Sequence, residues 1–274
     1  MDLLIRRARP SDKRDVLAAV RTIWGGHDRI PDVFDTWVRH RTGPFFVAES
    51  AGRVVGMGKL TVVSPTEAWL EGGRVAPRWR RKGIATALIA HRIDYARERG
   101  FRVVRFSTAS DNRPIHRSAR TFGFTRVARM SRHEAPAAPG TIPARARHAQ
   151  ERIVLHRVGP LVQRGHGWEW REITSRDVRA AIGRGRVFVP DARVGAAAVL
   201  GDRYEQSLMV AAVGGSVRPL TDLLRGLRGE ASRRGLDDVS FYVSNAIERR
   251  AARSAGYRRP WSGETYLFEK RLRA

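Results

Sequence analysis

The 274-residue chain contains no cysteine. Disulfide bonds, thiolate metal sites and a cysteine nucleophile are therefore excluded. The eight histidines show no spacing typical of a metal site, such as HExxH. We predict no structural metal.

Long hydrophobic runs are also missing. No stretch of 18 apolar residues occurs, and the amino-terminal "MDLLIRRARPSDKRD" lacks the apolar segment of a signal peptide. We therefore expect a cytoplasmic protein with no membrane partner. Because 42% of the residues are hydrophobic, a chain of this length can bury one large core or two ordinary ones.

Acidic residues are scarce beside basic ones. The chain has 52 Lys and Arg against 27 Asp and Glu, a formal net charge of +25, and all but four of its basic residues are arginines. Arginine binds phosphate through paired hydrogen bonds, so the excess favours a polyanionic partner. A basic protein without such a partner is the alternative.

Apolar periodicity and turn residues predict the order strand, helix, helix, three strands, helix, strand, helix, strand over residues 1–130. Ser11 is the expected N-cap of the first helix. Residues 131–150 contain three prolines and little periodicity, which predicts a linker or a long surface loop. The expected ranges are strands 3–10, 45–49, 53–62, 68–75 and 101–107, with helices 11–24 and 83–100.

The two halves of the chain resemble each other. Residues 98–124 are echoed by 233–257, because the spacing from Asn112 to Gly123 equals that from Asn245 to Gly256. An aromatic residue follows each of these glycines, and 45–56 are similarly echoed by 187–199. Such ordered self-similarity predicts two copies of one fold.

The stretch "VAPRWRRKGIATALI", residues 75–89, carries the clearest chemical signal. A strand leads into a cationic loop and then directly into a helix, whose N–H groups form an anion site suited to a diphosphate. Gly83 allows close approach of the backbone, Ala85 keeps the next turn thin, and Arg80, Arg81 and Lys82 add charge. A basic solvated loop is the alternative.

This stretch resembles the acyl-CoA pyrophosphate loop of the GNAT acyltransferase superfamily, with Arg80, Gly83 and Ala85 at the matching positions. Asn112 and the "FGF" at 122–124 resemble the next conserved block. The resemblance implies an α/β fold of tandem GNAT copies, each a mixed, mostly antiparallel twisted sheet flanked by helices. Residues 1–140 would be the catalytic domain and 141–274 a degenerate copy, because "VAAVGGSVRPLTDLL" at 210–224 lacks the arginine-to-glycine spacing.

The resemblance also assigns roles to individual residues. Glu71 is the expected general base, although an arginine-paired surface carboxylate is an alternative. Val75 would offer an N–H group to the acyl carbonyl, and a bulge at Gly72 and Gly73 would let the strand splay. The catalytic candidates are Glu71, Asn112 and His116; the expected cofactor-binding residues are Val75, Arg80, Arg81, Lys82, Gly83, Ile84 and Ala85.

One position departs from the family pattern. Many members have a tyrosine seven residues after the asparagine, and this tyrosine protonates the leaving thiolate. In this chain the asparagine is Asn112, and the position of the tyrosine is taken by Ala119. Ser118, His116 or Thr121 are possible substitutes, and His116 is equally well a solvated helix residue.

The charge and the missing tyrosine together suggest aminoacyl-tRNA as the acyl donor, with a small-molecule amine as the acceptor and no other cofactor. Trp79 would stack on a base, or else cover the core. The alternatives are an ordinary acetyl-CoA-dependent N-acetyltransferase and a GNAT-fold module that binds RNA without chemistry. The expected RNA-binding residues are Arg78, Trp79, Arg117, Arg120, Arg249, Arg250, Arg253, Arg258 and Arg259.

Overall fold

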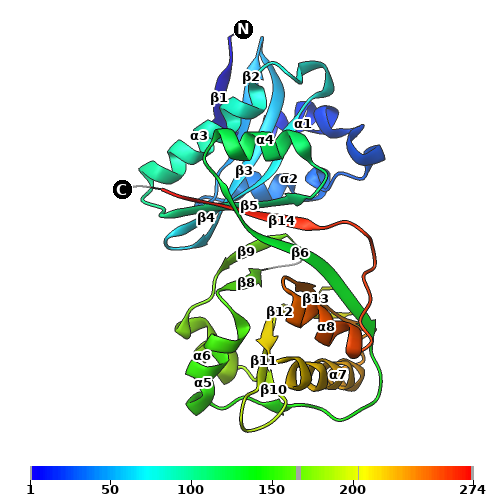
Figure 1. The fold of residues 1–274 in the computed structure, drawn as a ribbon. Helices are drawn as coiled ribbons and strands as arrows, with labels where there is room; N and C mark the ends of the chain where they lie inside the picture. Colours follow the sequence, from blue (N-terminus) through cyan, green and yellow to red (C-terminus); the bar gives the residue numbers. More distant parts are fainter. Residues whose placement is uncertain (1, 165–167, 203, 273–274) are drawn as a thin grey trace. The chain divides into compact units, whose positions relative to one another are not determined.

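The computed structural model describes residues 2–164, 168–202 and 204–272, which form two compact units (Figure 1). Unit 1 comprises residues 1–106, 114–125 and 268–274, and unit 2 comprises residues 107–113 and 126–267. Residues 107–113 therefore belong to unit 2 and residues 268–272 to unit 1, so neither unit is one continuous segment of the chain. Each unit is described by itself below.

Unit 1 is a twisted sheet with helices on both faces. Strands β1 to β4 form an antiparallel meander, and β5 pairs with β4 in parallel. The elements are β1 (Leu4–Arg7), α1 (Lys13–Val20), α2 (Ile30–Arg39), β2 (Phe45–Ser50), β3 (Arg53–Ser64), β4 (Glu67–Val75), α3 (Ile84–Glu98), the start of β5 (Val103–Ala109), nearly all of α4 (Arg113–Thr121) and the end of β14 (Thr265–Arg271).

Two hydrophobic clusters cover the two faces of the unit 1 sheet. Along β2, Phe45 and Val47 pack with residues of α1 and α2, whereas Phe46 and Ala48 pack with Ile84 and Leu88 of α3. This alternation follows from the two-residue period of a strand. It places α3 and the pair α1 and α2 on opposite faces of β2 to β4.

Unit 2 repeats the connectivity of unit 1. Its strands lie in the order β7, β10, β11, β12, β13, β6, and only the β12–β13 pair is parallel. A β8–β9 hairpin is inserted between its first two helices. The elements are β6 (Thr125–Pro136), β7 (Ala144–Arg145), α5 (Glu151–Val158), β8 (Leu161–Arg164), β9 (Glu169–Glu172), α6 (Ser175–Gly183), β10 (Val187–Val189), β11 (Ala196–Leu200), β12 (Ser207–Gly215), α7 (Val217–Arg233), β13 (Asp238–Val243) and α8 (Ala246–Ser254).

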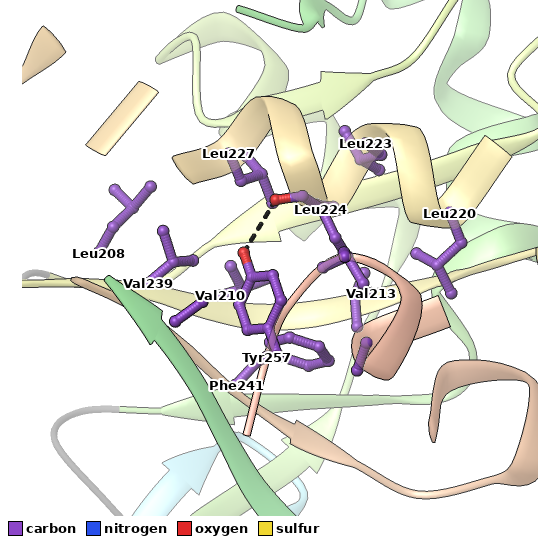
Figure 2. Close-up of a cluster of buried hydrophobic side chains, with 14 of the residues drawn as sticks. Leu208, Val210, Val213, Leu220, Leu223, Leu224, Leu227, Val239, Phe241 and Tyr257 are labelled. Atoms are coloured by element: carbon purple, nitrogen blue, oxygen red, sulfur yellow. Dashed lines mark hydrogen bonds between the residues drawn. The ribbon is translucent and has the colours of Figure 1, made fainter. Parts of the chain in front are cut away.

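The core of unit 2 is packed against α7. Leu220, Leu223, Leu224 and Leu227 of this helix are fully buried among residues of β12 and β13. Figure 2 shows the ring of Tyr257 within this cluster, where its hydroxyl donates to the carbonyl of Leu224 at 2.9 Å. Burial raises the pKa of Tyr257 far above its ordinary value, so the phenol stays neutral and serves as a donor.

The predicted fold class is confirmed, and the expected strands and helices of residues 1–130 all occur. Two local predictions are wrong. Ser11 does not cap the first helix: Asp12 accepts the Arg9 N–H at 2.7 Å, α1 begins at Lys13, and it ends at Val20 instead of continuing to residue 24.

Residues 131–150 are not a linker throughout. Residues 131–136 form the second half of β6 and pair with β13. Ser131, His133 and Ala135 point inward and are buried. Because two of these three inward residues are polar, hydrophobic alternation could not reveal the strand.

Candidate functional site

The junction between β4 and α3 exposes the start of a helix. After β4 ends at Val75, a short 3₁₀ turn (Pro77–Trp79) leads to Gly83, which has a φ of +79° and precedes α3. The first bond within the helix runs from the Ala87 N–H to the Gly83 carbonyl, so the preceding N–H groups lie at the helix start without helical acceptors. A Cβ atom at Gly83 would meet nothing within 4 Å, which leaves room for a ligand.

Positive charge surrounds this helix start. Arg78, Arg80, Arg81 and Lys82 are all exposed, and Arg81 itself has a φ of +62°. Ile84 is buried in the core, which anchors the first turn, whereas Ala85 is exposed. Backbone N–H groups, guanidinium groups and the helix dipole all favour an anion of diphosphate type here.

Trp79 lies against the protein core. Its half-buried side chain packs on the cluster of Phe46, Ile84 and their neighbours. The ammonium group of Lys82 lies 4.8 Å from its ring centroid. The ring therefore covers the core on one side and holds Lys82 in place at the loop.

Strand β4 separates from β5 soon after it begins. The parallel pairs are Glu67–Val103, Ala68–Val104 and Trp69–Arg105, and the pairing of β4 with β5 ends there. On its other edge β4 stays paired with β3, but Gly72 and Gly73 together oppose Gly58. This is a β-bulge, as the two glycines predict, and it lies within the part of β4 that leaves β5.

Glu71 lies beside this bulge. It is half-buried, opposes Lys59 across the β3–β4 ladder, and its Oε1 accepts a hydrogen bond from the Thr61 hydroxyl at 2.5 Å. Its carboxylate forms no close ion pair with an arginine among the described residues, although its charge raises the pKa of the buried Arg92. Its assignment as a general base stays a prediction.

Two buried arginines near β4 gave no signal in the sequence. Arg105 donates to Glu67 at 2.6 Å and to Glu269 at 2.8 Å, forming an ion cluster at the parallel β4–β5 pair. Arg92, on α3, is 4% exposed and reaches the bulge. Helical spacing marks position 92 as inward-facing, but an arginine at such a position is ordinarily read as surface.

The residues of the Asn112 block have local partners. Asn112 lies in unit 2, where its amide donates to the Thr108 hydroxyl at 2.9 Å. His116 lies in unit 1, half-buried, with its ring 5.6 Å from that of Phe268. Ala119 is buried, and the hydroxyls of Ser118 and Thr121 bond to carbonyls of their own helix. These two hydroxyls are therefore occupied, and no role in proton transfer is assigned to them.

The expected RNA-binding arginines lie in both units. Arg78 precedes the α3 loop, and Arg117 and Arg120 are exposed on α4. In unit 2, Arg249, Arg250 and Arg253 are exposed on α8, and Arg258 and Arg259 follow it. Burial lowers the pKa of His133, and the charges of Arg259, Arg249 and Arg253 lower it further, so these three cations gather near one point.

Metal ligands and membrane-spanning helices are two further features of interest. Within the described residues, no group of three or more His, Asp or Glu side chains could hold a metal ion. No helix in the same part of the chain is both long and apolar enough to cross a membrane.

Comparison with known proteins gives a consistent family. Residues 14–124 match the family described as Acetyltransferase (GNAT) family. A histidine N-acetyltransferase from Scomber australasicus is 31% identical over 83 residues, and one from Xenopus tropicalis is 33% identical over 75 residues. These matches cover 30% and 27% of this chain, and the chain spans only about a quarter of the length of either relative, 25% and 23%.

The fold extends over the whole chain in solved structures. A GCN5-related N-acetyltransferase from Sphaerobacter thermophilus superimposes with a TM-score of 0.66 at 14% identity, covering 99% of this chain and 96% of that one. At such identity the likeness concerns the fold. Residues 14–124, which contain the β4–α3 site, thus match the acetyltransferase (GNAT) family of acyltransferases, and the likeness of the remaining residues concerns the fold.

Proposed function

We propose that the protein is an N-acetyltransferase that uses acetyl-CoA and acylates a primary amine. The observation that carries the proposal is that one strand, β4, links two features: the exposed, cation-rich start of α3 and the half-buried carboxylate of Glu71. A diphosphate needs the cation-rich helix start, and an attacking amine needs the carboxylate as its base. The β4 bulge lies between them.

The chain's own residues suit each task. N–H groups at Gly83, Ile84 and Ala85, with Arg80, Arg81 and Lys82, would hold the CoA diphosphate, and Val75 would orient the acyl group. Bound acetyl-CoA supplies an activated thioester. Glu71 would accept the proton of the amine, and the Thr61 hydroxyl, 2.5 Å from Oε1, fixes the orientation of that carboxylate.

The amine is proposed to belong to a small molecule. The relatives from Scomber and Xenopus are named as histidine N-acetyltransferases, so free amino acids are the first acceptors to try. Unit 2 is proposed to be a degenerate copy without a site, because only Ser216 separates β12 from α7. The cytoplasm is the proposed location.

The test is an acetyl-transfer assay by mass spectrometry with acetyl-CoA and a panel of amines that includes amino acids. Glu71→Gln should lower kcat by roughly 100-fold or more, the usual contribution of a positioned general base. Glu98→Gln, at the exposed end of α3, is the matched control and should leave kcat unchanged. Full activity of Glu71→Gln would remove Glu71 as the base.

A second candidate uses aminoacyl-tRNA as the donor or partner. Its support is the arginine surface of unit 2, defined as Arg249, Arg250, Arg253, Arg258 and Arg259. None of these five makes an ion pair with a carboxylate of the described residues, and Glu248 beside them is buried and bonded to Ser244 and Asn245. Exposed, unpaired guanidinium groups suit a phosphate backbone.

The second candidate is tested by titrating the protein with charged and uncharged tRNA across a salt series. Replacing Arg249, Arg250 and Arg253 by Glu should weaken binding and reduce the salt slope by roughly 2 to 3. The matched control changes the exposed Arg152, Arg176 and Arg184 of the same unit to Glu, with the same change in net charge. Equal losses in both variants would mean general attraction only, and absence of tRNA binding would leave acetyl-CoA as the donor.

A further inference from the structure

We propose that Arg92 is a catalytic residue of the β4 site, whose Nη2 group donates a hydrogen bond to the carbonyl oxygen of the acyl group being transferred. The proposal rests on the proposed function, because it requires an acyl donor bound along β4. It adds a side-chain donor from α3 to a site otherwise built from backbone N–H groups and Glu71.

The first observation is the position of the guanidinium group. Arg92 is 96% buried, and its Nε donates to the Leu88 carbonyl at 3.0 Å, while Nη1 donates to the carbonyls of Lys59 and Glu71, both at 3.2 Å. A Cβ atom at Gly58 would lie 2.7 Å from Cζ. The guanidinium group therefore lies flat against the bulge, and only a glycine at position 58 allows that approach.

The second observation is that one end of this buried cation is not used. All hydrogen bonds of Arg92 to the described residues come from Nε and Nη1, and Nη2 has no acceptor there. No carboxylate of the described residues forms a close ion pair with the guanidinium group: Glu71 offers it a backbone carbonyl, while its carboxylate bonds to Thr61 and acts on Arg92 through its charge alone. Nη2 is not among the fully buried polar atoms that lack a partner in the described residues, so this end of the guanidinium group is accessible and open to a ligand.

The third observation gives the direction of Nη2. A Cβ atom at Gly73 would lie 3.8 Å from Nη2, and Gly73 is exposed, so this end of the guanidinium group is next to open backbone of β4. A donor whose diphosphate lies at Gly83 and whose acyl group reaches Glu71 must follow β4 from Val75 to Glu71. It therefore passes Gly73 and the free end of Arg92.

The chemistry fits a cation at this point. When the amine nitrogen forms its bond to the carbonyl carbon, the electron pair of the C=O double bond moves to oxygen, which gains negative charge near Nη2. As the double bond re-forms, the carbon–sulfur bond breaks, its electron pair leaves with the thiolate, and the amine proton passes to Glu71. Arg92 remains protonated throughout, because burial lowers its pKa only to about 10.

The decisive experiment measures binding instead of turnover. Isothermal titration compares two unreactive CoA thioethers, one with an acetonyl group that keeps the carbonyl and one with a propyl group that lacks it. The wild-type protein should prefer the acetonyl compound by about 10-fold, the value of one hydrogen bond to a charged donor. Arg92→Met should bind both compounds equally, whereas Arg92→Lys should keep part of the preference.

Two further variants separate ligand binding from a purely structural role. Gly73→Ala puts a methyl group at ordinary contact distance from Nη2 and leaves the other Arg92 bonds in place, so it should also abolish the preference. Arg97→Met removes an exposed arginine of the same helix and should change nothing. Thermal melts establish that each variant is folded.

The outcomes are distinct. A wild-type protein that binds neither compound contradicts the proposed function itself. Equal wild-type affinity for both compounds, or a preference that survives in Arg92→Met and Gly73→Ala, overturns the role of Arg92 and leaves the proposed function standing. Loss of the preference in both variants with CoA binding retained, and a kcat lowered roughly 100-fold in folded Arg92→Met with little change in KM, supports the proposal.

Discussion

The parallel strand pairs of the two units have the same register but different side chains. In unit 1, Glu67 and Arg105 lie across the β4–β5 pair and form a buried ion pair at 2.6 Å. In unit 2, the corresponding residues of β12 and β13 are Ser207 and Ser240, whose hydroxyls lie 3.0 Å apart. Both pairs occupy the last region before the strands separate. The Ser207 hydroxyl also donates to the Asp238 carboxylate, so unit 2 has hydroxyl groups bonded to one carboxylate where unit 1 has a buried ion pair.

The helices that follow differ in the same way. Eight residues before the glycine that ends each helix, α3 has Arg92 and α7 has Leu227. Leu227 is fully buried in the cluster that surrounds Tyr257 (Figure 2). Arg92, in contrast, keeps a free donor beside β4. Unit 2 thus fills with apolar side chains the place where unit 1 retains a buried charge.

The connections into these helices complete the contrast. Residues 76–83 join β4 to α3, whereas Ser216 alone joins β12 to α7. A single residue leaves no loop to surround a diphosphate. Unit 2 therefore illustrates what the fold becomes when packing is favoured over ligand binding. The first three predictions below each test one of these differences, and the last tests a property that the units share.

The largest effect is expected at the loop. Gly83→Asp puts a carboxylate and an unfavourable positive φ where the diphosphate is proposed to bind, so acetyl-CoA binding and turnover should fall by roughly 100-fold or more. Ser216→Asp places the same residue at the start of α7, where aspartate is a good N-cap, and should leave turnover unchanged. Retained turnover in Gly83→Asp would reject the loop as the donor site.

The next effect concerns the buried charges. Glu67→Gln leaves Arg105 with one carboxylate fewer and should lower the free energy of unfolding by about 3–5 kcal/mol, the usual cost of breaking a buried pair. Ser207→Ala removes one hydroxyl at the corresponding position, with its hydrogen bond to Asp238, and should cost only about 1.5–3 kcal/mol. Denaturant unfolding of both variants measures the difference, and equal losses would mean that the ion pair contributes no more than the serine pair.

A third prediction concerns the apolar core of unit 2. Leu227→Ala leaves a cavity among Leu224, Phe241 and Tyr257 and should lower the free energy of unfolding by about 2–5 kcal/mol. Because unit 2 is proposed to have no site, kcat and KM of the folded variant should match those of the wild type. A changed KM at a temperature where the variant is folded would show that unit 2 contributes to the reaction.

The sequence predicted the parts of this site that depend on backbone chemistry. Gly83 and the cations before it identified the helix start, and the paired glycines 72 and 73 identified the bulge, because turns and bulges leave residue types that can be read directly. Arg92 and Arg105 could not be found in this way. Their burial depends on Gly58, Glu67 and Glu269, which are far apart in the chain and are brought together only by the fold.

The smallest predicted effect concerns acid stability, where the units are expected to behave alike. Asp177 of unit 2 is partly buried, which raises its pKa, but hydrogen bonds from Arg171 and Thr174 outweigh this and lower the pKa to about 2. Asp12 of unit 1 has a lowered pKa as well: burial raises it, and hydrogen bonds from Arg6 and the Arg9 N–H lower it by more. A depressed carboxyl pKa stabilises the folded protein above the unfolded value of 3.8 and stops doing so as the pH falls through the folded value.

Asp177→Asn should therefore lower the free energy of unfolding by roughly 1 kcal/mol at pH 6, after allowance for solvent screening, and the loss should shrink between pH 4 and pH 2. Asp12→Asn should follow the same course. Urea unfolding at a series of pH values measures both differences. A loss of stability that does not depend on pH would show that the asparagine amide fails as a hydrogen-bond partner for reasons other than charge. The same pH dependence in both variants would mean that the two units share the electrostatics of their helix starts, although their sites and cores differ.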